Sequence, residues 1–347
     1  MRTGLGGDES YSYSGSPHEE LRSNTNVPQI MAYERANGDI GIRNDIWIVP
    51  LVGCINVISQ NIARQFEASG KLSEGSQVTV LAHPFGCSQL GDDLENTRAI
   101  LQNLVVHPNA GGVLVIGLGC ENNTLDLFQK GLDLPDESRV RFMVAQDYDD
   151  ENEVALAHLD ELSTQLHRDK RVAVGVDRLR VGLKCGGSDG FSGITANPLL
   201  GAFSDWLCSR GGTTVLSEVP EMFGAERILM ERAENQGVFG ETVKLINDFK
   251  QYYRDHNQPI YENPSPGNKS GGITTLEEKS LGCTQKAGTA IVRDVVRYKE
   301  RLSKRGLNLL EAPGNDGTSI TRLLPVGATW CCLPRDEEIQ WGPLCQP

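Results

Sequence analysis

The chain has 347 residues, of which 39% are hydrophobic and 23% charged, a composition typical of soluble globular proteins. This length suits two domains or one large α/β unit. The formal net charge of −13 and the lack of a basic stripe argue against a nucleic-acid-binding protein. No apolar run approaches the roughly 20 residues of a membrane span, and no apolar signal-peptide core begins the chain, so we expect a cytoplasmic protein.

Nine cysteines in a chain without a secretory signal argue against a disulfide framework. None of them belongs to a C-x-x-C pair of the zinc-binding kind. The alternatives are buried thiols, metal thiolates and redox-active groups, and for a single cysteine the buried thiol is the most common.

Residues 1–30 are polar and lack periodicity, and we expect a disordered tail there. Asn37-Gly38 indicates a hairpin turn soon after it. In the first α/β domain, residues 31–170, apolar runs predict strands and amphipathic spacing predicts helices. The expected strands are 46–52, 77–82, 112–116 and 140–144, and the expected helices are 57–68, 93–106 and 152–167.

A charged stretch at 167–171 marks the boundary to a second α/β domain, residues 171–322. Residues 262–288 form a long active-site loop, which is unusual unless it is functional. The alternation of strands and helices predicts mostly parallel sheets with flanking helices, in two consecutive α/β units. The expected strands are 179–183 and 213–217, and the expected helices are 199–208, one that begins within 218–226, 241–256 and 293–304.

A glycine-rich segment, residues 182–198, leads from a strand into a helix. Glycine buries nothing and costs backbone entropy, so several in one loop indicate close approach to a ligand. Free N–H groups at the start of the helix would suit a carboxylate or phosphate. An ordinary strand-to-helix turn is an equally good interpretation of this loop alone.

Cysteines next to glycines recur where apolar runs give way to polar residues, at Cys87, Cys120, Cys185 and Cys283. In an open α/β sheet, ligands collect outside the carboxyl ends of the strands. Four similar segments could therefore line one crevice. This recurrence is the strongest functional signal that the residues themselves carry.

Two of these places add acid–base or metal-binding groups. His83 and Cys87 follow one strand and could bind a divalent ion such as iron or zinc, although a surface histidine and a buried thiol are the more common case. Cys120 and Glu121 begin a Cys-Glu-Asn-Asn segment that suits a metal or a hydroxylated substrate. A turn that caps the next helix explains that segment equally well.

The 262–288 loop is rich in hydroxyl, amide, lysine and carboxylate groups, which suits a polyhydroxylated ligand. Lys269, Lys279 and Lys286 could neutralise a substrate carboxylate, and a lysine in a dry pocket can carry a proton. A flexible surface linker is the alternative, against which its two prolines and Leu276 argue.

Together these segments resemble the altronate dehydratase/galactarate dehydratase family of sugar-acid hydro-lyases. The resemblance covers roughly residues 30–321. The stretches that carry it are 35–44, Gly86-Cys-Ser-Gln-Leu-Gly-Asp-Asp93, 115–123, Cys185-Gly-Gly-Ser-Asp-Gly190, Glu218-Val-Pro-Glu-Met-Phe-Gly-Ala-Glu226, 263–288 and Ala312-Pro-Gly-Asn-Asp316.

The resemblance implies dehydration of D-altronate to 2-keto-3-deoxy-D-gluconate, assisted by Fe2+ or Mn2+. A base takes the proton next to the carboxylate, a metal or cation holds the enediolate, and an acid assists loss of the neighbouring hydroxyl. On this basis the catalytic candidates are His83, Lys286 and Glu121, the metal candidates are Cys87, Cys120, Cys185 and Cys283, and the substrate-binding candidates are Ser188, Asp189, Asn268 and Lys269.

The chain departs from the family at both ends. Fused members carry a small N-terminal domain, and related sulfolactate sulfo-lyases carry it on a separate subunit, so a small partner subunit is one expectation and a homo-oligomer another. After residue 321 the family pattern stops, and we place no strand or helix in 323–347. Reading plausible codons of Trp330-Cys-Cys332 one base out of register restores a family-like sequence, so we hypothesise a frameshift near residues 321–325.

Two other readings remain. The chain could be another acid lyase of the family that acts on galactarate or sulfolactate. It could also be an inactive, truncated remnant that keeps a sugar-acid-binding crevice. Metal content separates these classes, because a lyase should hold about one divalent ion per site.

Overall fold

The computed structural model describes residues 11–15, 25–185, 189–261, 263–335 and 338–343. The chain divides into two compact units at Val174/Gly175. The N-terminal unit begins at Ile30, and the C-terminal unit begins at Gly175 and includes the described residues before Ile30. Among the described residues, no helix is both long and apolar enough to cross a membrane.

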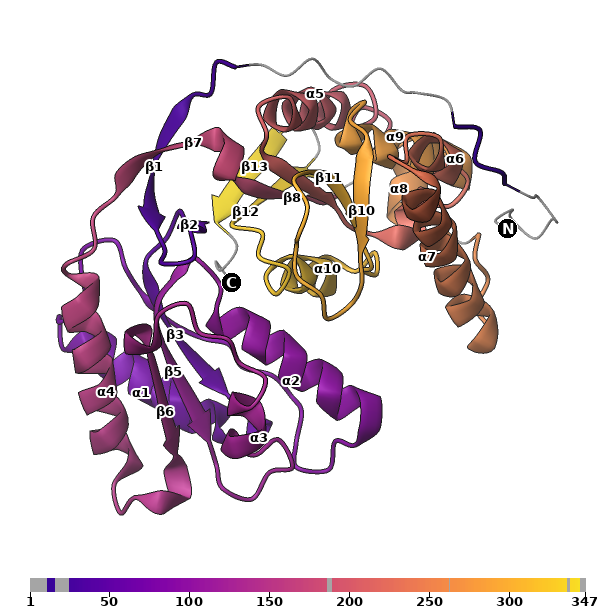
Figure 1. Ribbon diagram of the computed structural model, residues 1–347. Helices are drawn as coiled ribbons and strands as arrows, with labels where there is room; N and C mark the ends of the chain where they lie inside the picture. Colours follow the sequence, from indigo (N-terminus) through magenta and orange to yellow (C-terminus); the bar gives the residue numbers. More distant parts are fainter. Residues whose placement is uncertain (1–10, 16–24, 186–188, 262, 336–337, 344–347) are drawn as a thin grey trace. The chain divides into compact units, whose positions relative to one another are not determined.

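A four-stranded parallel sheet forms the centre of the N-terminal unit, in the order β4-β3-β5-β6 (Figure 1). Every residue of its two central strands is buried, as expected for a parallel sheet that helices cover on both faces. The four predicted strands are thereby confirmed. They are β3 (Asp45–Pro50), β4 (Val78–Val80), β5 (Ala110–Gly117) and β6 (Val140–Val144).

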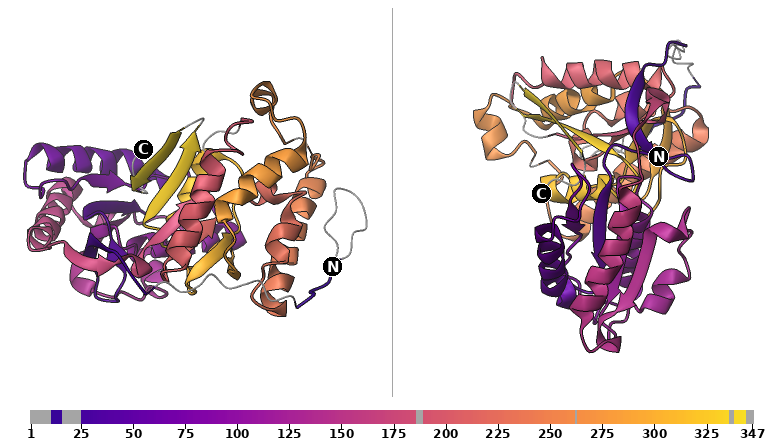
Figure 2. Two further views of the ribbon diagram at one scale, coloured as in Figure 1. Left: turned by 90° about the horizontal axis from the view of Figure 1, so that it is seen from above. Right: turned by 90° about the vertical axis from the view of Figure 1, so that its left-hand side faces the viewer.

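Helices flank this sheet (Figure 2). α1 and α4 pack on the face that carries Ile46 and Ile48, where they share one hydrophobic core. Because side chains alternate along a strand, Trp47 points to the opposite face, and α2 contacts β3 and β5 there. The helices are α1 (Asn56–Ala68), α2 (Gly91–Val105), α3 (Leu125–Gln129) and α4 (Glu151–Leu166), with 3-10 turns at η1 (Gly53–Ile55), η2 (Glu137–Arg139) and η3 (Ala145–Asp147).

A small three-stranded sheet has the order β2-β1-β7. β1 (Gln29–Glu34) and β2 (Ile40–Gly41) are antiparallel, and β7 spans Val172–Gly175. Gly38 in the turn has φ 83°, a left-handed conformation that glycine adopts without strain. The hairpin turn predicted at Asn37-Gly38 is thereby confirmed.

A six-stranded sheet, β10-β11-β9-β8-β12-β13, forms the centre of the C-terminal unit. The ladders from β10 to β12 are parallel, and β12 and β13 are antiparallel. The predicted α/β class with mostly parallel sheets is confirmed. The strands are β8 (Arg180–Leu183), β9 (Thr213–Leu216), β10 (Val292–Val296), β11 (Gly306–Leu310), β12 (Trp330–Arg335) and β13 (Glu338–Pro343).

Helices cover this sheet from both sides. α10 contributes Leu323 to a core with Val215, and a Cβ on Gly182 would clash with Leu323, so close packing requires glycine there. Ser204 of α5 bonds Thr214 on the opposite face. The helices are α5 (Ala196–Cys208), α6 (Glu226–Met230), α7 (Gln236–Asp255), α8 (Pro266–Ser270), α9 (Leu276–Thr284) and α10 (Asp316–Leu323), with 3-10 turns at η4 (Val176–Arg178), η5 (Val219–Met222) and η6 (Gln285–Ala287).

Three predictions for the C-terminal unit were wrong. Residues 293–304 are not a helix, because Val292–Val296 forms β10, pairs with β11 and buries its three valines. Residues 262–288 are not one long loop: Ser265 and Thr275 cap α8 and α9. The region after residue 321 does form structure, since β12 pairs in parallel with β8.

Asp169, just after the end of α4, forms hydrogen bonds to Arg139 and Asn44 elsewhere in the N-terminal unit. It accepts two hydrogen bonds from Arg139, at 2.7 and 2.8 Å, and one from Asn44 at 3.0 Å. Burial favours the neutral acid, but the Arg139 guanidinium outweighs it and holds the pKa of Asp169 below its usual range. A carboxylate of this kind stabilises the fold above its unfolded-state pKa of about 3.9, and the stabilisation is lost as pH falls through the folded-state pKa.

We therefore expect Asp169→Asn to lower the melting temperature at pH 7. Between about pH 4 and pH 2, the melting temperature should then fall less in this variant than in the native chain. Thermal unfolding followed by circular dichroism at both ends of this range measures the change. Asp160→Asn is the control, because Asp160 pairs with Lys71 at a site where both side chains are about half exposed. An unchanged acid dependence in Asp169→Asn would contradict the assignment.

Candidate metal centre

The carboxyl ends of β8 and β9 bring two polar segments together. The two strands are parallel neighbours, and Leu183 lies opposite Leu216. The chain continues from β8 into Cys185 and from β9 into η5, which carries Glu221. Helix α9, with Cys283 near its end, packs against η5. Ligand sites of open α/β sheets lie in this position, outside the carboxyl ends of the strands.

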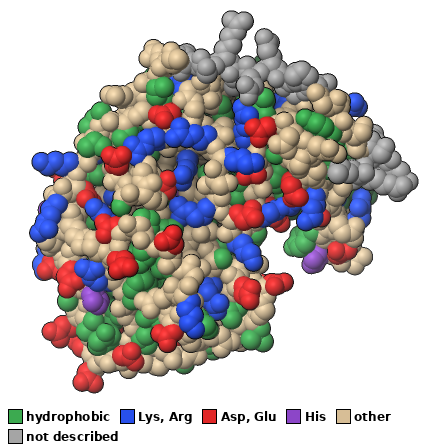
Figure 3. Space-filling view, in the orientation of Figure 1, with side chains coloured by type: hydrophobic (Ala, Val, Ile, Leu, Met, Phe, Trp, Pro, Cys, Tyr) green, Lys and Arg blue, Asp and Glu red, His purple; other side chains and the backbone are tan. Residues whose placement is uncertain are grey.

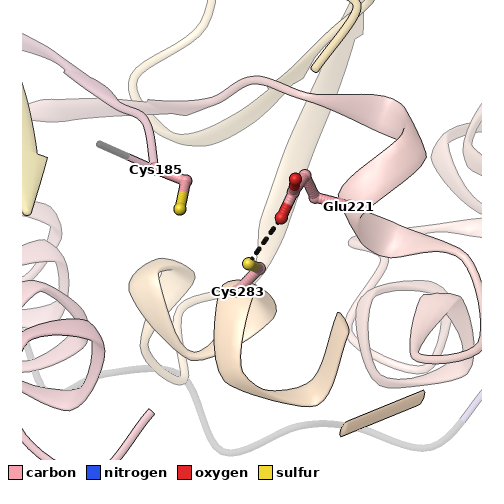
Figure 4. Close-up of side chains that lie close together, drawn as sticks. All are labelled: Cys185, Glu221 and Cys283. Atoms are coloured by element: carbon pink, nitrogen blue, oxygen red, sulfur yellow. Dashed lines mark hydrogen bonds between the residues drawn. The ribbon is translucent and has the colours of Figure 1, made fainter. Parts of the chain in front are cut away.

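Cys185, Glu221 and Cys283 form a compact triad (Figure 4). One ligand atom from each residue lies within 4.8 Å of the other two. The Cys283 thiol donates to Glu221 Oε2 at 2.7 Å. The side chains are almost fully buried, with the three residues 5%, 8% and 3% exposed. Among the residues that the structure describes, no other group of three or more possible metal ligands lies this close together.

Three buried lysines surround the triad. Lys279 pairs with Glu221 Oε1 at 3.2 Å, and Lys286 and Lys184 pair with the two oxygens of Glu218 at 3.3 and 2.8 Å. Burial opposes the charge on Lys286, but the Glu218 carboxylate and the neighbouring thiols outweigh it and raise the pKa of Lys286. Lys286 is therefore a charged ammonium group at neutral pH.

The pKa values of the two thiols shift in opposite directions. The hydrogen bond from Cys283, helped by the Lys286 ammonium, lowers the pKa of Cys185 to about 6 against the effect of burial. The same bond and burial raise the pKa of Cys283 well above its ordinary value. Because Cys283 has one proton, it can donate to Cys185 or to Glu221, but not to both at once. A metal bound by both sulfurs would displace that proton.

The donor set fits a divalent transition metal. Two thiol sulfurs and one carboxylate oxygen make three protein ligands, the number found in catalytic zinc sites that keep one position open for water or substrate. Thiolates favour iron and zinc, whereas manganese prefers oxygen ligands. Lys279 bonds the second oxygen of Glu221, so it would orient that carboxylate as an outer-shell partner.

The two other predicted metal ligands, Cys87 and Cys120, belong to the N-terminal unit, and both are exposed. His83 lies in the same unit, where Nε2 bonds the Pro50 carbonyl at 2.9 Å and Nδ1 accepts from the Phe85 N–H at 3.3 Å. Burial lowers the pKa of His83. Both ring nitrogens are engaged, so proton transfer by His83 would require one of these two hydrogen bonds to break.

Glu121 has a structural role in the N-terminal unit. Its carboxylate accepts from the N–H groups of Leu118 and Gly119, at 3.0 and 2.7 Å, and so closes the turn after β5. The next helix, α3, is capped by Thr124, so Glu121 closes a turn but does not cap that helix. Glu121 stays a predicted catalytic residue that the structure places in a turn.

The three described substrate-binding candidates lie in two segments that contact one another: Asp189 in the glycine-rich segment, and Asn268 and Lys269 in helix α8. Asp189 accepts from the Ser192 N–H at 2.7 Å, and the Gly190 N–H donates to the Gly271 carbonyl at 2.8 Å. Asn268 completes the capping box of α8, and Lys269 is exposed beside it. Ser188 lies outside the described residues. The glycine-rich segment and the region 262–288 therefore meet in the C-terminal unit.

Sequence reasoning missed Glu221, Glu218 and Lys184. The two glutamates stand in the stretch 218–226, within which we predicted that a helix begins. Helix α6 begins only at Glu226, so the earlier carboxylates are free to turn inward. Two acidic residues three apart, directly after an apolar strand, were the signal that could have identified them.

Two protein-family models match the chain, one in each unit. Residues 32–167 match the family model of the D-galactarate dehydratase/altronate hydrolase second domain. Residues 176–334 match that of the D-galactarate/altronate dehydratase C-terminal domain. The second match contains all three residues of the triad and runs past residue 321, where the motifs that we recognised end.

Individual relatives show the same similarity. The chain is 53% identical to the altronate dehydratase of Escherichia coli and 54% identical to that of Bacillus subtilis, in each case over 94% of this chain and 66% of the relative. It is 32% identical to the galactarate dehydratase (L-threo-forming) of Escherichia coli, over 91% of this chain and 63% of the relative. The chain thus spans just under two thirds of the length of these relatives.

Proposed function

The chain belongs to the D-galactarate/altronate dehydratase family, and we propose on this premise that it is a hydro-lyase that dehydrates D-altronate to 2-keto-3-deoxy-D-gluconate. The altronate dehydratases, at 53% and 54% identity, favour altronate over galactarate as the substrate. The single observation that carries a chemical role is the buried triad of Cys185, Glu221 and Cys283.

The reaction needs no oxidant. The C–H bond next to the carboxylate breaks, its electron pair forms a carbon–carbon double bond, and the neighbouring hydroxyl leaves with a proton as water. The resulting enol becomes the 2-keto acid by proton transfer. The difficult part is the negative charge that develops on the carboxylate oxygens as the proton leaves, so positive groups fixed nearby lower the barrier.

We propose that the triad holds Fe2+, with Mn2+ as the weaker candidate because two of the three ligands are sulfur. When bound, the ion would supply a Lewis acid for the substrate's oxygens. Lys286 stays protonated beside the triad, so its role is to stabilise negative charge rather than to take a proton.

The direct test is 2-keto acid formation by the reduced protein with Fe2+, with D-altronate, galactarate and sulfolactate in parallel. Product from D-altronate supports the proposal. Product from galactarate or sulfolactate alone would reassign the substrate within the family. Failure with all three acids, by a protein that binds Fe2+ at the triad, would contradict the proposed activity and favour the inactive binding remnant.

A further inference from the structure

Glu218 has an unusual backbone. Its φ of 68° and ψ of 65° lie in the left-handed region, which it shares with one other described residue that is not glycine, Asn257. Asparagine visits this region readily, whereas glutamate does so only at a cost in backbone strain. Glycine would avoid this cost. A glutamate there indicates that its side chain is needed in the position that this backbone allows.

The Glu218 carboxylate bonds to two segments beside the triad, the residues that follow β8 and the turn η6. Its Oε2 accepts from the Cys185 N–H at 2.6 Å and from the Lys286 ammonium at 3.3 Å, and its Oε1 pairs with Lys184 at 2.8 Å. The first partner is a triad residue, and the second lies three residues after another, Cys283. Glu218 is 1% exposed, and its three partners are buried as well.

We infer that Glu218 is a positioning residue of the metal centre, which holds the backbone of Cys185 and balances the charge of Lys184 and Lys286 so that the triad can accept a cation. This inference rests on the proposed metal site and extends it to a residue that does not ligate the ion. Without the Glu218 carboxylate, two buried ammonium groups would repel a divalent ion, and Cys185 would lose a backbone anchor.

The test is the affinity of the reduced, metal-free chain for Co2+, measured by competition with a chelator. Cobalt also gives a thiolate-to-metal absorption band that reports whether both sulfurs ligate the ion. We expect Glu218→Gln to weaken Co2+ binding by about 10- to 100-fold, the usual effect of losing an outer-shell partner. Glu218→Asp keeps the charge on a shorter side chain, so its affinity should lie between those of Glu218→Gln and the native chain.

Two further variants separate positioning from folding. Glu218→Gly removes the carboxylate and also the backbone strain, so it should bind Co2+ as weakly as Glu218→Gln but unfold at a higher denaturant concentration than Glu218→Gln does. Glu226→Gln breaks another buried ion pair of the same unit, with Lys250, and should lose stability but keep native Co2+ affinity.

The outcomes are distinct. Native affinity and an unchanged absorption band in both Glu218→Gln and Glu218→Gly, each folded by circular dichroism, would overturn the inference and leave the metal site intact. Absence of Co2+ binding by the native chain would overturn the proposed metal site and the inference together. Weaker binding in Glu226→Gln, equal to that in Glu218→Gln, would show that loss of stability alone explains the effect and would also overturn the inference.

Discussion

Replacing Cys283 with serine is expected to weaken divalent metal binding by more than about 100-fold, beyond the usual loss for an outer-shell partner. Cys283 supplies one of the two sulfurs of the proposed site with three protein ligands, and its thiol donates to Glu221 at 2.7 Å. Serine keeps the size of the side chain but replaces a thiolate by a hydroxyl that stays protonated at neutral pH. The thiolate-to-cobalt absorption band should lose intensity accordingly.

Cys208→Ser is the matched control. Cys208 is a partly buried thiol of the same unit that is not part of the triad, and its sulfur contacts the Thr214 hydroxyl at 3.3 Å. This variant should keep native metal affinity and the full absorption band. If Cys283→Ser bound Co2+ as tightly as the native chain, the triad would not be the metal site, whichever residues then held the ion.

Replacing Lys250 with methionine is expected to lower the free energy of unfolding by about 3–5 kcal/mol. Lys250 pairs with Glu226 at 2.7 Å, and the side chains are 1% and 3% exposed. Its ammonium also lies 5.2 Å from the centre of the Phe223 ring. Methionine fills similar space but leaves the Glu226 carboxylate buried without its partner, and the large cost comes from that uncompensated charge rather than from the lost attraction.

The double variant Glu226→Gln/Lys250→Met provides the check, because it leaves no buried charge behind and should recover much of the lost stability. Glu231→Gln is the exposed counterpart. Glu231 pairs with Arg227 at the same distance, but the side chains are 50% and 75% exposed, so its loss should change stability by less than about 0.5 kcal/mol. Urea unfolding of all variants measures these differences, and equal losses for the buried and exposed pairs would contradict the prediction.

The strands and most helices could be predicted because their signals are local. The buried strands β3 and β5 are continuous apolar runs, and α4 has leucines at helical spacing that face one core. The prediction failed at Val292–Val296, where charged residues resemble a helix surface. There the partner strand β11, which follows later in the chain, decides the structure.

The candidate site was only partly predictable. The recurrence of cysteine beside glycine predicted that Cys185 and Cys283 line one crevice, and the family resemblance made them metal candidates. The structure brings these two together. The same pattern selected Cys87 and Cys120, which are exposed in the N-terminal unit. Glu221 was missed, because an acidic residue before a helix has a sufficient local explanation as a helix-dipole partner.

The sequence by itself determined the α/β class, the family and the strand ends at which polar groups gather, because these depend on the order and spacing of residues along the chain. The tertiary structure alone decided which of those groups meet. The pairing of β8 with β9 places Cys185 near η5, and the packing of α9 on η5 adds Cys283 and Lys279. Such convergence depends on contacts between residues far apart in sequence, and local patterns carry no information about them.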